Sequence, residues 1–325
     1  MLQDRLLKAW QTKGLWAWAL RPAAALYGFL LRRKARRFTP LDQPAGQRPP
    51  IIVVGNVLVG GVGKTPIVMA LVQHLQSLGY RPGVISRGYG RQQSSVAPLA
   101  ILPATPAAQA GDEALLIAQT TGAPVFVAAN RPAALAALCA AHPEVNVVLS
   151  DDGLQHWALP RDVEIVVWDA RGLGNGYLLP AGPLREPWPR QPWHPYFKGT
   201  QVWQLFRTGQ EGTHASPEQA PHAWPVVRHL ADYALQANGS RLGLSAFPQQ
   251  HLRALAGIAQ PEAFFADLRA GGLALQQTVA LPDHADVAAW WQSLDAEAQS
   301  ATWVCTEKDA VKLWAVCPQA WAVPL

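Results

Sequence analysis

The sequence predicts an α/β fold in which a doubly wound parallel sheet is followed by a second, smaller α/β domain. Apolar, strand-like runs alternate with amphipathic helical segments, as in parallel sheets covered by helices on both faces. The first run, Ile51–Asn56, leads into a glycine-rich turn that ends in Lys64-Thr65. The alternation resumes after a polar stretch that begins near Thr208. Together these observations predict a fold of the P-loop NTPase type.

The composition sets broad limits on the class of protein. The chain has 325 residues, of which 50% are hydrophobic, so it can bury the cores of two medium-sized domains. Cys139, Cys305 and Cys317 lie far apart, which argues against a disulfide framework or a zinc site and fits a reducing compartment. The formal net charge of +5 is modest for this length.

The N-terminal segment, residues 1–37, is apolar and then basic. Leu15–Leu31 is apolar except for Arg21 and is interrupted by Pro22, and five cations crowd Arg32–Arg37. A spanning helix needs about 20 unbroken apolar residues, so we expect a membrane-associated helix lying at the surface of the bilayer. The alternative is a helix packed on the protein with its arginines in solvent. No nucleic-acid-binding motif accompanies the basic run, so no nucleic-acid partner is expected.

Residues 38–207 are predicted to form the nucleotide-binding domain. The expected strands are Ile51–Asn56, Pro82–Ser86, Pro124–Ala128, Val145–Leu149 and Val163–Trp168, and the expected helices are Lys64–Leu78, Asp112–Thr121 and Pro132–Ala141. Ligands of such sheets bind beyond the carboxyl ends of the strands. The motifs that follow these strands should therefore converge on one site.

The smaller domain is predicted over residues 222–325. A Gly-, Pro- and polar-rich stretch, Thr208–Pro225, is expected to be a linker or long loop ahead of it. Within the domain we expect strands over Leu252–Ile258, Leu273–Val279 and Thr302–Thr306, and helices over Pro261–Ala270 and Val287–Leu294.

The turn after the first strand is predicted to bind a nucleotide triphosphate. Its residues are Leu58, Val59, Gly60, Gly61, Val62, Gly63, Lys64 and Thr65. Glycines let successive N–H groups point at phosphate oxygens, a lysine here reaches the β- and γ-phosphates, and a threonine hydroxyl reaches Mg²⁺. Leu58 occupies the position of the first glycine of the usual pattern. A plain glycine-rich turn is the alternative, but it leaves Lys64 and Thr65 unexplained.

A second acidic motif follows the strand that is expected to end near Leu149. Asp151 and Asp152 stand where a Walker B carboxylate holds Mg²⁺ in P-loop folds. Asp-Asp-Gly is also a common turn sequence. The presence of Lys64 and Thr65 favours the metal-binding interpretation.

Two further charged pairs have two interpretations each. Asp112 and Glu113 precede an apolar helix, where acids cap the N-terminus as well as serving a site. Arg185 and Glu186 lie in a Gly- and Pro-rich run, where arginine suits a phosphate or forms an exposed ion pair of little energetic value.

These motifs occur in the order found in one enzyme family. They are Gly60–Pro66, Ser86–Gly90, Gly111–Glu113, Asp151–His156, Leu179–Glu186, Ala256–Ile258, Pro282–His284 and Thr306–Lys312. Each motif alone is weak, but the ordered set is specific. Over nearly its whole length, the chain resembles the tetraacyldisaccharide 4'-kinase family of Gram-negative bacteria.

The resemblance implies a lipid kinase with ATP and Mg²⁺ as cofactors. The γ-phosphate would pass to the 4'-hydroxyl of tetraacyldisaccharide 1-phosphate, in lipid A biosynthesis, at the cytoplasmic face of the inner membrane. Asp112 matches the family's general base and His284 the histidine that pairs with it. Since these two residues fall on different predicted domains, we expect them to meet when the domains close.

The resemblance also implies roles for residues outside the phosphate loop. Asp151 and Asp152 match the family's metal-binding aspartates, with Thr65 completing the metal site. Contacts with substrate, or support for residues that make them, are expected from His156, Arg185, Glu186, Glu113 and Arg87. The lipid substrate and the membrane surface are the expected partners, and no protein partner is evident.

Two other classes of protein remain as alternatives. A membrane-recruited ATPase of the partitioning type shares the Gly-Gly-x-Gly-Lys-Thr loop, but usually has a lysine where Val59 stands and needs no second domain with His284. A small-molecule kinase free of the membrane would leave the apolar and basic N-terminus without a purpose.

Overall fold

A computed structural model of the chain describes residues 10–37, 48–89, 91, 97–102, 104–190, 199–207, 222–247, 251–258, 260–282 and 285–324. The chain divides into two compact units. The first unit comprises Met1–Arg87, Ser95–Ala100 and Thr121–Val227, and the second comprises Gly88–Ser94, Ile101–Thr120 and Arg228–Leu325. The helix that begins at Asp112 therefore belongs largely to the second unit.

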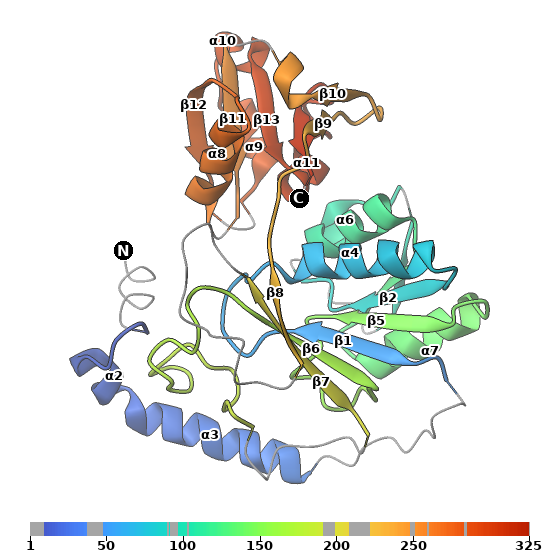
Figure 1. Cartoon of the computed structure of the whole chain (residues 1–325), viewed down its shortest axis with the longest axis vertical. Helices are drawn as coiled ribbons and strands as arrows, with labels where there is room; N and C mark the ends of the chain where they lie inside the picture. The colour runs from blue at the N-terminus through green and yellow to red at the C-terminus, as the bar shows by residue number, and fades with distance from the viewer. Residues whose placement is uncertain are drawn as a thin grey trace. The chain divides into compact units, whose positions relative to one another are not determined.

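The first unit is built on an eight-stranded sheet with the order β3-β4-β2-β5-β1-β6-β7-β8 (Figure 1). The strands are β1 Ile51–Gly55, β2 Pro82–Ser86, β3 Leu99–Ile101, β4 Val125–Val127, β5 Val147–Asp151, β6 Val163–Trp168, β7 Gln201–Arg207 and β8 Ala223–Val226. The pairings of β1 with β5 and β6, of β2 with β4 and β5, and of β7 with β6 and β8 are parallel. The predicted P-loop-type parallel sheet is confirmed.

Strand β1 lies at the point where the chain reverses its direction across the sheet. Its neighbours are β5 on one side and β6 on the other, both parallel to it. Four of its five residues are buried, because both faces of the strand are covered. Ligands bind open α/β sheets at such a point, beyond the carboxyl ends of the strands.

Two helices of this unit pack on the sheet. They are α4 Lys64–Ser77, which follows β1, and α7 Arg131–Ala141, which follows β4. The step from β1 to β2 and the step from β4 to β5 cross the sheet in opposite directions, so right-handed crossovers place α4 and α7 on opposite faces (Figure 1). Asn130 caps α7 by accepting from the Ala133 N–H.

The structure corrects several boundaries and adds short elements. Strand β5, predicted over Val145–Leu149, runs over Val147–Asp151, so Asp151 lies within it. Residues 223–225, predicted to be loop, belong to β8, which pairs in parallel with β7 from Gln204 to Arg207. Strand β3 and the single-turn helix α5 Ala107–Ala110 were not predicted. These short elements carry too few residues for a periodic pattern.

Within residues 10–37 the structure describes two helices, α2 Leu15–Ala19 and α3 Arg21–Arg36. Pro22 lies in the first turn of α3, where its missing N–H is tolerated, so the break in the apolar run becomes a helix start. The buried residues of the two helices are small: Ala17, Ala24, Gly28 and Ala35. Tyr27 and Leu31 are half-buried. The other large apolar side chains of the two helices are 51% to 88% exposed: Leu15, Trp16, Trp18, Leu26, Phe29 and Leu30. No helix in the described ranges is long and apolar enough to span a membrane.

The second unit has a mixed six-stranded sheet with the order β10-β9-β14-β13-β11-β12. Its strands are β9 Tyr233–Leu235, β10 Arg241–Gly243, β11 Leu252–Ala256, β12 Leu275–Ala280, β13 Thr302–Thr306 and β14 Trp321–Val323. Its other elements are η2 Leu244–Ala246, α8 Pro261–Ala270, α9 Val287–Gln292, α10 Ala296–Ser300 and α11 Glu307–Leu313; α6 Asp112–Thr121 also lies largely in this unit.

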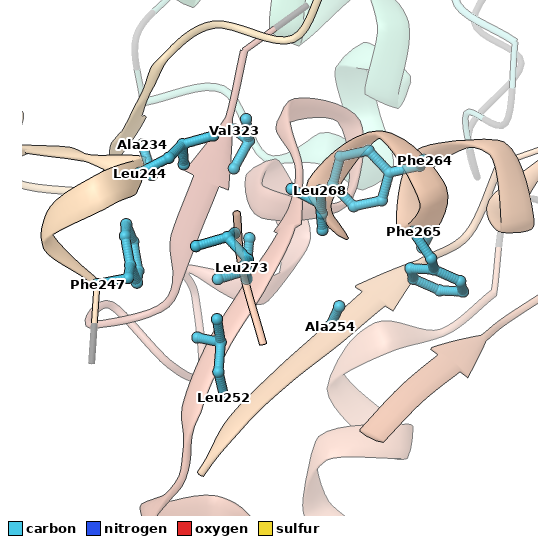
Figure 2. Packing of buried hydrophobic residues seen from close by; sticks show 12 residues of the cluster. Ala234, Leu244, Phe247, Leu252, Ala254, Phe264, Phe265, Leu268, Leu273 and Val323 are labelled. Atoms are coloured by element: carbon cyan, nitrogen blue, oxygen red, sulfur yellow. The ribbon is translucent and has the colours of Figure 1, made fainter. Parts of the chain in front are cut away.

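Alternating side chains of β11 and β13 build a core on each face of this sheet. On one face Leu252, Ala254 and Val304 pack with Phe264 and Phe265 of α8 (Figure 2). The opposite face is packed by a second cluster that includes Leu255, Trp303, Cys305, Trp291 and Leu313. The two-residue period of a strand explains why neighbours in sequence join different cores.

Candidate active site

The glycine-rich loop joins the end of β1 to the start of α4. Gly60 and Gly63 have φ values of +99° and +81°, a region that residues with a Cβ avoid. Gly63 is the N-cap of α4, and Lys64 opens the helix. The N-terminus of α4 therefore faces the loop with N–H groups that suit an anion.

The ammonium group of Lys64, at the start of α4, is held by two side chains. Its Nζ donates to Asn56 Oδ1 at 3.2 Å and lies 3.5 Å from Asp152 Oδ1. Asn56 is itself fully buried and donates to the Leu58 carbonyl at 2.8 Å. This arrangement holds the ammonium group in a fixed position, ready for a phosphate.

The position of Leu58 explains why a leucine replaces the usual glycine. Leu58 is fully buried and forms an antiparallel bridge with Leu184. On either side of it, Val59 N donates to Pro183 O at 2.9 Å and Arg185 N donates to Val57 O at 2.7 Å. The run that ends in Arg185 thus acts as a short strand beside the phosphate loop, and an apolar side chain at position 58 stabilises that pairing.

The two aspartates of the predicted metal site end strand β5. Asp151 is the last residue of β5 and is 1% exposed, whereas Asp152 has a φ of +47°. Arg185 Nη1 donates to both carboxylate oxygens of Asp152, at 3.1 and 3.2 Å. Partial burial raises the pKa of Asp152, but the Lys64 ammonium and the Arg185 guanidinium outweigh it and hold that pKa below its usual value.

The oxygen donors at this point fit Mg²⁺. Thr65 is 9% exposed at the first turn of α4, and with Asp151 and Asp152 it supplies hydroxyl and carboxylate ligands, the hard donors that Mg²⁺ takes. Within the described ranges, no group of three or more His, Cys, Asp or Glu side chains could hold a metal ion.

Two arginines that the sequence analysis did not single out lie against the loop. Arg171 Nη1 donates to Val59 O at 3.2 Å, and Arg207 Nη1 donates to Val62 O at 3.1 Å. A Cβ built on Gly60 or Gly63 would meet these guanidinium groups at 3.2 and 3.1 Å. In a trans peptide the N–H points away from the C=O, so holding each carbonyl also fixes the direction of the next N–H.

Arg131 and His156 lie near the aspartates. Arg131, at the start of α7, is 3% exposed; burial lowers its pKa to about 10, and Asp151 and Asp152 partly offset that effect. Burial lowers the pKa of His156 to about 4, and the positive charge of Arg131 adds to this. His156 is therefore neutral near pH 7. Arg87 is exposed just beyond the end of β2.

Glu186 follows Arg185 in the chain and is fully buried. It accepts a hydrogen bond from Gln155 Nε2 at 2.9 Å, and the same nitrogen lies 3.0 Å from the Asn56 carbonyl. These contacts join the loop after β5 to the loop after β1. Arg185 is directed at Asp152 and Glu186 is fully buried, so the geometry does not fit the exposed ion pair that was one interpretation of these two residues.

The second unit contains the acidic pair that precedes α6. Asp112 is 6% exposed overall, and its Oδ2 lies 2.6 Å from Lys312 Nζ. Glu113 Oε1 lies 3.8 Å from Lys308 Nζ. Both lysines belong to α11, and α11 is part of the Thr306–Lys312 motif. His284, the predicted partner of Asp112, lies outside the described residues.

The contacts that the sequence analysis missed join segments far apart in the chain. Arg131, Arg171 and Arg207 each follow or end a strand, which was the available signal, since strand ends line the site of such a sheet. Lys312 stood in a recognised motif, but its partner is about 200 positions away. Sequence spacing alone gives no indication of such a pair.

A family model and the curated relatives that match this chain carry the same description. The family model described as tetraacyldisaccharide-1-P 4'-kinase matches residues 16–325. The "Tetraacyldisaccharide 4'-kinase" of Polaromonas naphthalenivorans (strain CJ2) is 50% identical over 97% of this chain and 87% of its own length. The protein of that name from Acidovorax sp. (strain JS42) is 48% identical, over 100% of this chain and 90% of its own length.

A solved structure resembles the fold of this chain. The Aquifex aeolicus LpxK crystal structure in complex with ATP aligns with a TM-score of 0.73, covering 94% of this chain and 93% of that one, at 23% sequence identity. This likeness concerns the fold.

Proposed function

This chain belongs to the tetraacyldisaccharide-1-P 4'-kinase family, and on that premise we propose that it transfers the γ-phosphate of ATP to the 4'-hydroxyl of tetraacyldisaccharide 1-phosphate. The reaction is a step of lipid A biosynthesis. The observation that carries the proposal is the phosphate loop, in which a fixed lysine and two aspartates meet beside glycines with positive φ.

In this proposal, residues 58–65 bind the triphosphate. Lys64 neutralises charge on the β- and γ-phosphates, and the N–H groups of the loop and of the first turn of α4 hold their oxygens. Arg171 and Arg207 keep the loop peptides in their orientation.

Mg²⁺ would be held by Thr65, Asp151 and Asp152. When bound, it would neutralise charge on the β- and γ-phosphates. Arg185 keeps the Asp152 carboxylate ionised and directed, so that residue is ready to bind a cation at neutral pH.

Asp112 is the proposed general base. A sugar hydroxyl is a poor nucleophile near neutral pH, so a carboxylate within hydrogen-bond reach takes its proton as the phosphoryl group moves. His284 is proposed to pair with Asp112. His156, Arg185, Glu113 and Arg87 are proposed to contact the substrate or support the residues that do, and the burial of Glu186 favours the supporting role for that residue.

The N-terminal helices are proposed to rest on the cytoplasmic face of the inner membrane. Their small residues are buried and their large apolar residues are exposed, the reverse of a helix that only packs on a core. The arginines and lysine of Arg32–Arg37 suit anionic lipid headgroups. A lipid with four acyl chains leaves the bilayer at a cost of about 0.8 kcal/mol per CH₂, so its kinase must work at the surface.

The proposal is tested by phosphate transfer from γ-labelled ATP to tetraacyldisaccharide 1-phosphate in detergent micelles. We expect labelled lipid from the wild type and none from Lys64→Ala or Asp112→Ala. ATP hydrolysis without labelled lipid would instead support a membrane-recruited ATPase.

A second experiment tests the membrane contact. Cosedimentation with vesicles that contain phosphatidylglycerol should weaken at least tenfold when Trp16 and Phe29 are both replaced by serine, because each exposed ring contributes about 1.5–3 kcal/mol when buried. Replacing Leu78 and Tyr80, which are also exposed but lie at the end of α4, is the matched control. Equal binding by both double variants would contradict the proposed contact surface.

A further inference from the structure

We propose that Lys312 is a positioning residue for the phosphoryl-transfer step, holding the Asp112 carboxylate and the backbone next to His284 in one arrangement. This inference rests on the role proposed above for Asp112. Thr306–Lys312 is a recognised motif to which no role has yet been given.

The ammonium group of Lys312 has two partners of different kinds. Its Nζ lies 2.6 Å from Asp112 Oδ2, and it donates to the Ala285 carbonyl at 3.4 Å. Ala285 directly follows His284 in the chain. The side chains of Lys312 and Asp112 are only 23% and 9% exposed, so water screens this pair less than an ion pair at the surface. One side chain thus joins the proposed base to the segment that carries its proposed partner.

The helix that carries Lys312 is fixed at its start. Thr306 caps α11 by accepting from Asp309 N at 3.2 Å, and its hydroxyl donates to Asp309 Oδ2 at 2.6 Å. The same carboxylate oxygen accepts from Gly257 N at 2.9 Å, at the end of β11. A Cβ on Gly257 would lie 2.7 Å from Asp309 Oδ1, which explains the glycine. The motif therefore anchors α11 to two strands and gives Lys312 a rigid base.

The chemistry of the step gives this cation a use. A carboxylate that works beside a triphosphate is exposed to negative potential, which favours its protonated and therefore inactive form. By holding one oxygen of Asp112, Lys312 also fixes the direction of the whole carboxylate, as proton transfer requires.

Lys308 provides a matched comparison on the same helix. It precedes Lys312 by one turn, and its Nζ lies 3.8 Å from Glu113 Oε1, a longer separation to a carboxylate that is 37% exposed. A pair of this kind contributes about 0–1 kcal/mol. Replacing Lys308 removes the same charge from the same helix without touching Asp112.

The test begins with lipid phosphorylation by Lys312→Met, Lys312→Arg and Lys308→Met in the full chain. We expect Lys312→Met to lower kcat by about 100-fold with the KM for ATP changed less than about twofold, since the effect acts on the transition state. Lys312→Arg should recover about tenfold of that loss, and Lys308→Met should lower kcat by no more than about threefold. Thermal unfolding of each variant checks that the fold is kept.

A double-mutant cycle with Asp112→Asn separates the inference from the role on which it rests. If Lys312 acts through Asp112, the double variant should be no slower than Asp112→Asn alone. Multiplied effects, or a normal kcat in Lys312→Met while Asp112→Asn is inactive, would overturn the inference and leave the role of Asp112 intact. A wild-type rate in Asp112→Asn would overturn both.

Discussion

Two carboxylates of the first unit, Glu164 and Asp152, are each held between two cations, but their surroundings differ. The cations are Arg161 and Arg190 for Glu164, and Lys64 and Arg185 for Asp152. The Glu164 side chain is 3% exposed, whereas that of Asp152 is 34% exposed. The same pattern of charges is therefore buried around Glu164 and partly exposed to solvent around Asp152.

The balance of charge also differs between the two places. Around Glu164, a second buried carboxylate, Glu186, lies 4.0 Å from Arg190, so two arginines face two acids. Arg161 also donates to the carbonyls of Leu154 and His156 and so holds the loop after β5. In this network the two positive charges are matched by two buried negative charges.

Around Asp152 the cations outnumber the acids. Arg131 adds a third positive charge to those of Lys64 and Arg185, against Asp151 and Asp152. An excess of positive charge that is partly open to solvent is what a site for a polyanion requires. The comparison teaches that burial and charge balance together separate a structural ion network from a binding site, although both use the same residue types.

The largest expected effect that sharpens this comparison comes from Asp152→Asn. We expect kcat to fall by about 1,000-fold, or about 4 kcal/mol in the barrier, while the free energy of unfolding changes by less than about 1 kcal/mol. Steady-state kinetics and urea denaturation measure the two quantities. A large loss of stability would show that Asp152 belongs to the structural class.

Glu164→Gln should show the opposite behaviour. Removing the charge of Glu164 leaves two buried arginines facing the single carboxylate of Glu186, so one positive charge is uncompensated and we expect a loss of about 3 kcal/mol in unfolding free energy. The kcat of the folded protein should stay within about threefold of wild type. Glu144→Gln, which removes a solvent-accessible carboxylate paired with His142, is the control and should leave the free energy of unfolding unchanged within the error of the measurement.

Arg207→Leu tests whether the conformation of the phosphate loop depends on the hydrogen bond from Arg207 to the Val62 carbonyl. Without the bond to Val62 O, we expect the KM for ATP to rise about tenfold, which corresponds to about 1.4 kcal/mol. Arg241→Leu removes an exposed arginine of the second unit and should leave the KM for ATP unchanged. An unchanged KM in both variants would mean that the glycine conformations are stable by themselves.

The smallest expected effect is spectroscopic. Burial and Arg131 lower the pKa of His156 to about 4, so the NMR signals of its ring should keep neutral-imidazole shifts down to about pH 5. The unfolded chain takes up this proton near its ordinary value of about 6.5. The contribution of the neutral ring to stability is therefore present above pH 6.5 and declines as the pH falls towards 4. A midpoint near 6.5 in the folded protein would contradict the described surroundings of His156.

The parts of the molecule that sequence predicted well are those encoded locally. The strand Ile51–Gly55, the glycine turn and the helix from Lys64 follow one another in the chain, and their periodicity and turn chemistry were sufficient. The apolar strand that leads to Asp151 and Asp152 was predicted for the same reason, and the assignment of these aspartates to a metal site stays a prediction. The assignments of Asp112, His284 and the domain limits stay predictions.

What the sequence could not predict depends on strand order and on contacts across the chain. Arg171 and Arg207 reach the phosphate loop because β6 and β7 lie on the side of β1 opposite β5. Leu58 departs from the usual glycine because Leu184 packs beside it. These facts depend on tertiary neighbours, which a single sequence does not reveal.

Residues 180–185, the run that ends in Arg185, connect the phosphate loop to the N-terminal residues of the first unit. On one side it pairs with the phosphate loop, and on the other its backbone accepts from the Tyr27 hydroxyl at 2.9 Å and the Trp10 indole at 2.9 Å. Shortening the chain beyond Tyr27 would therefore remove two hydrogen bonds that support the backbone beside the glycine-rich loop. An inhibitor that wedges between Tyr27 and this run should weaken ATP binding without entering the ATP site.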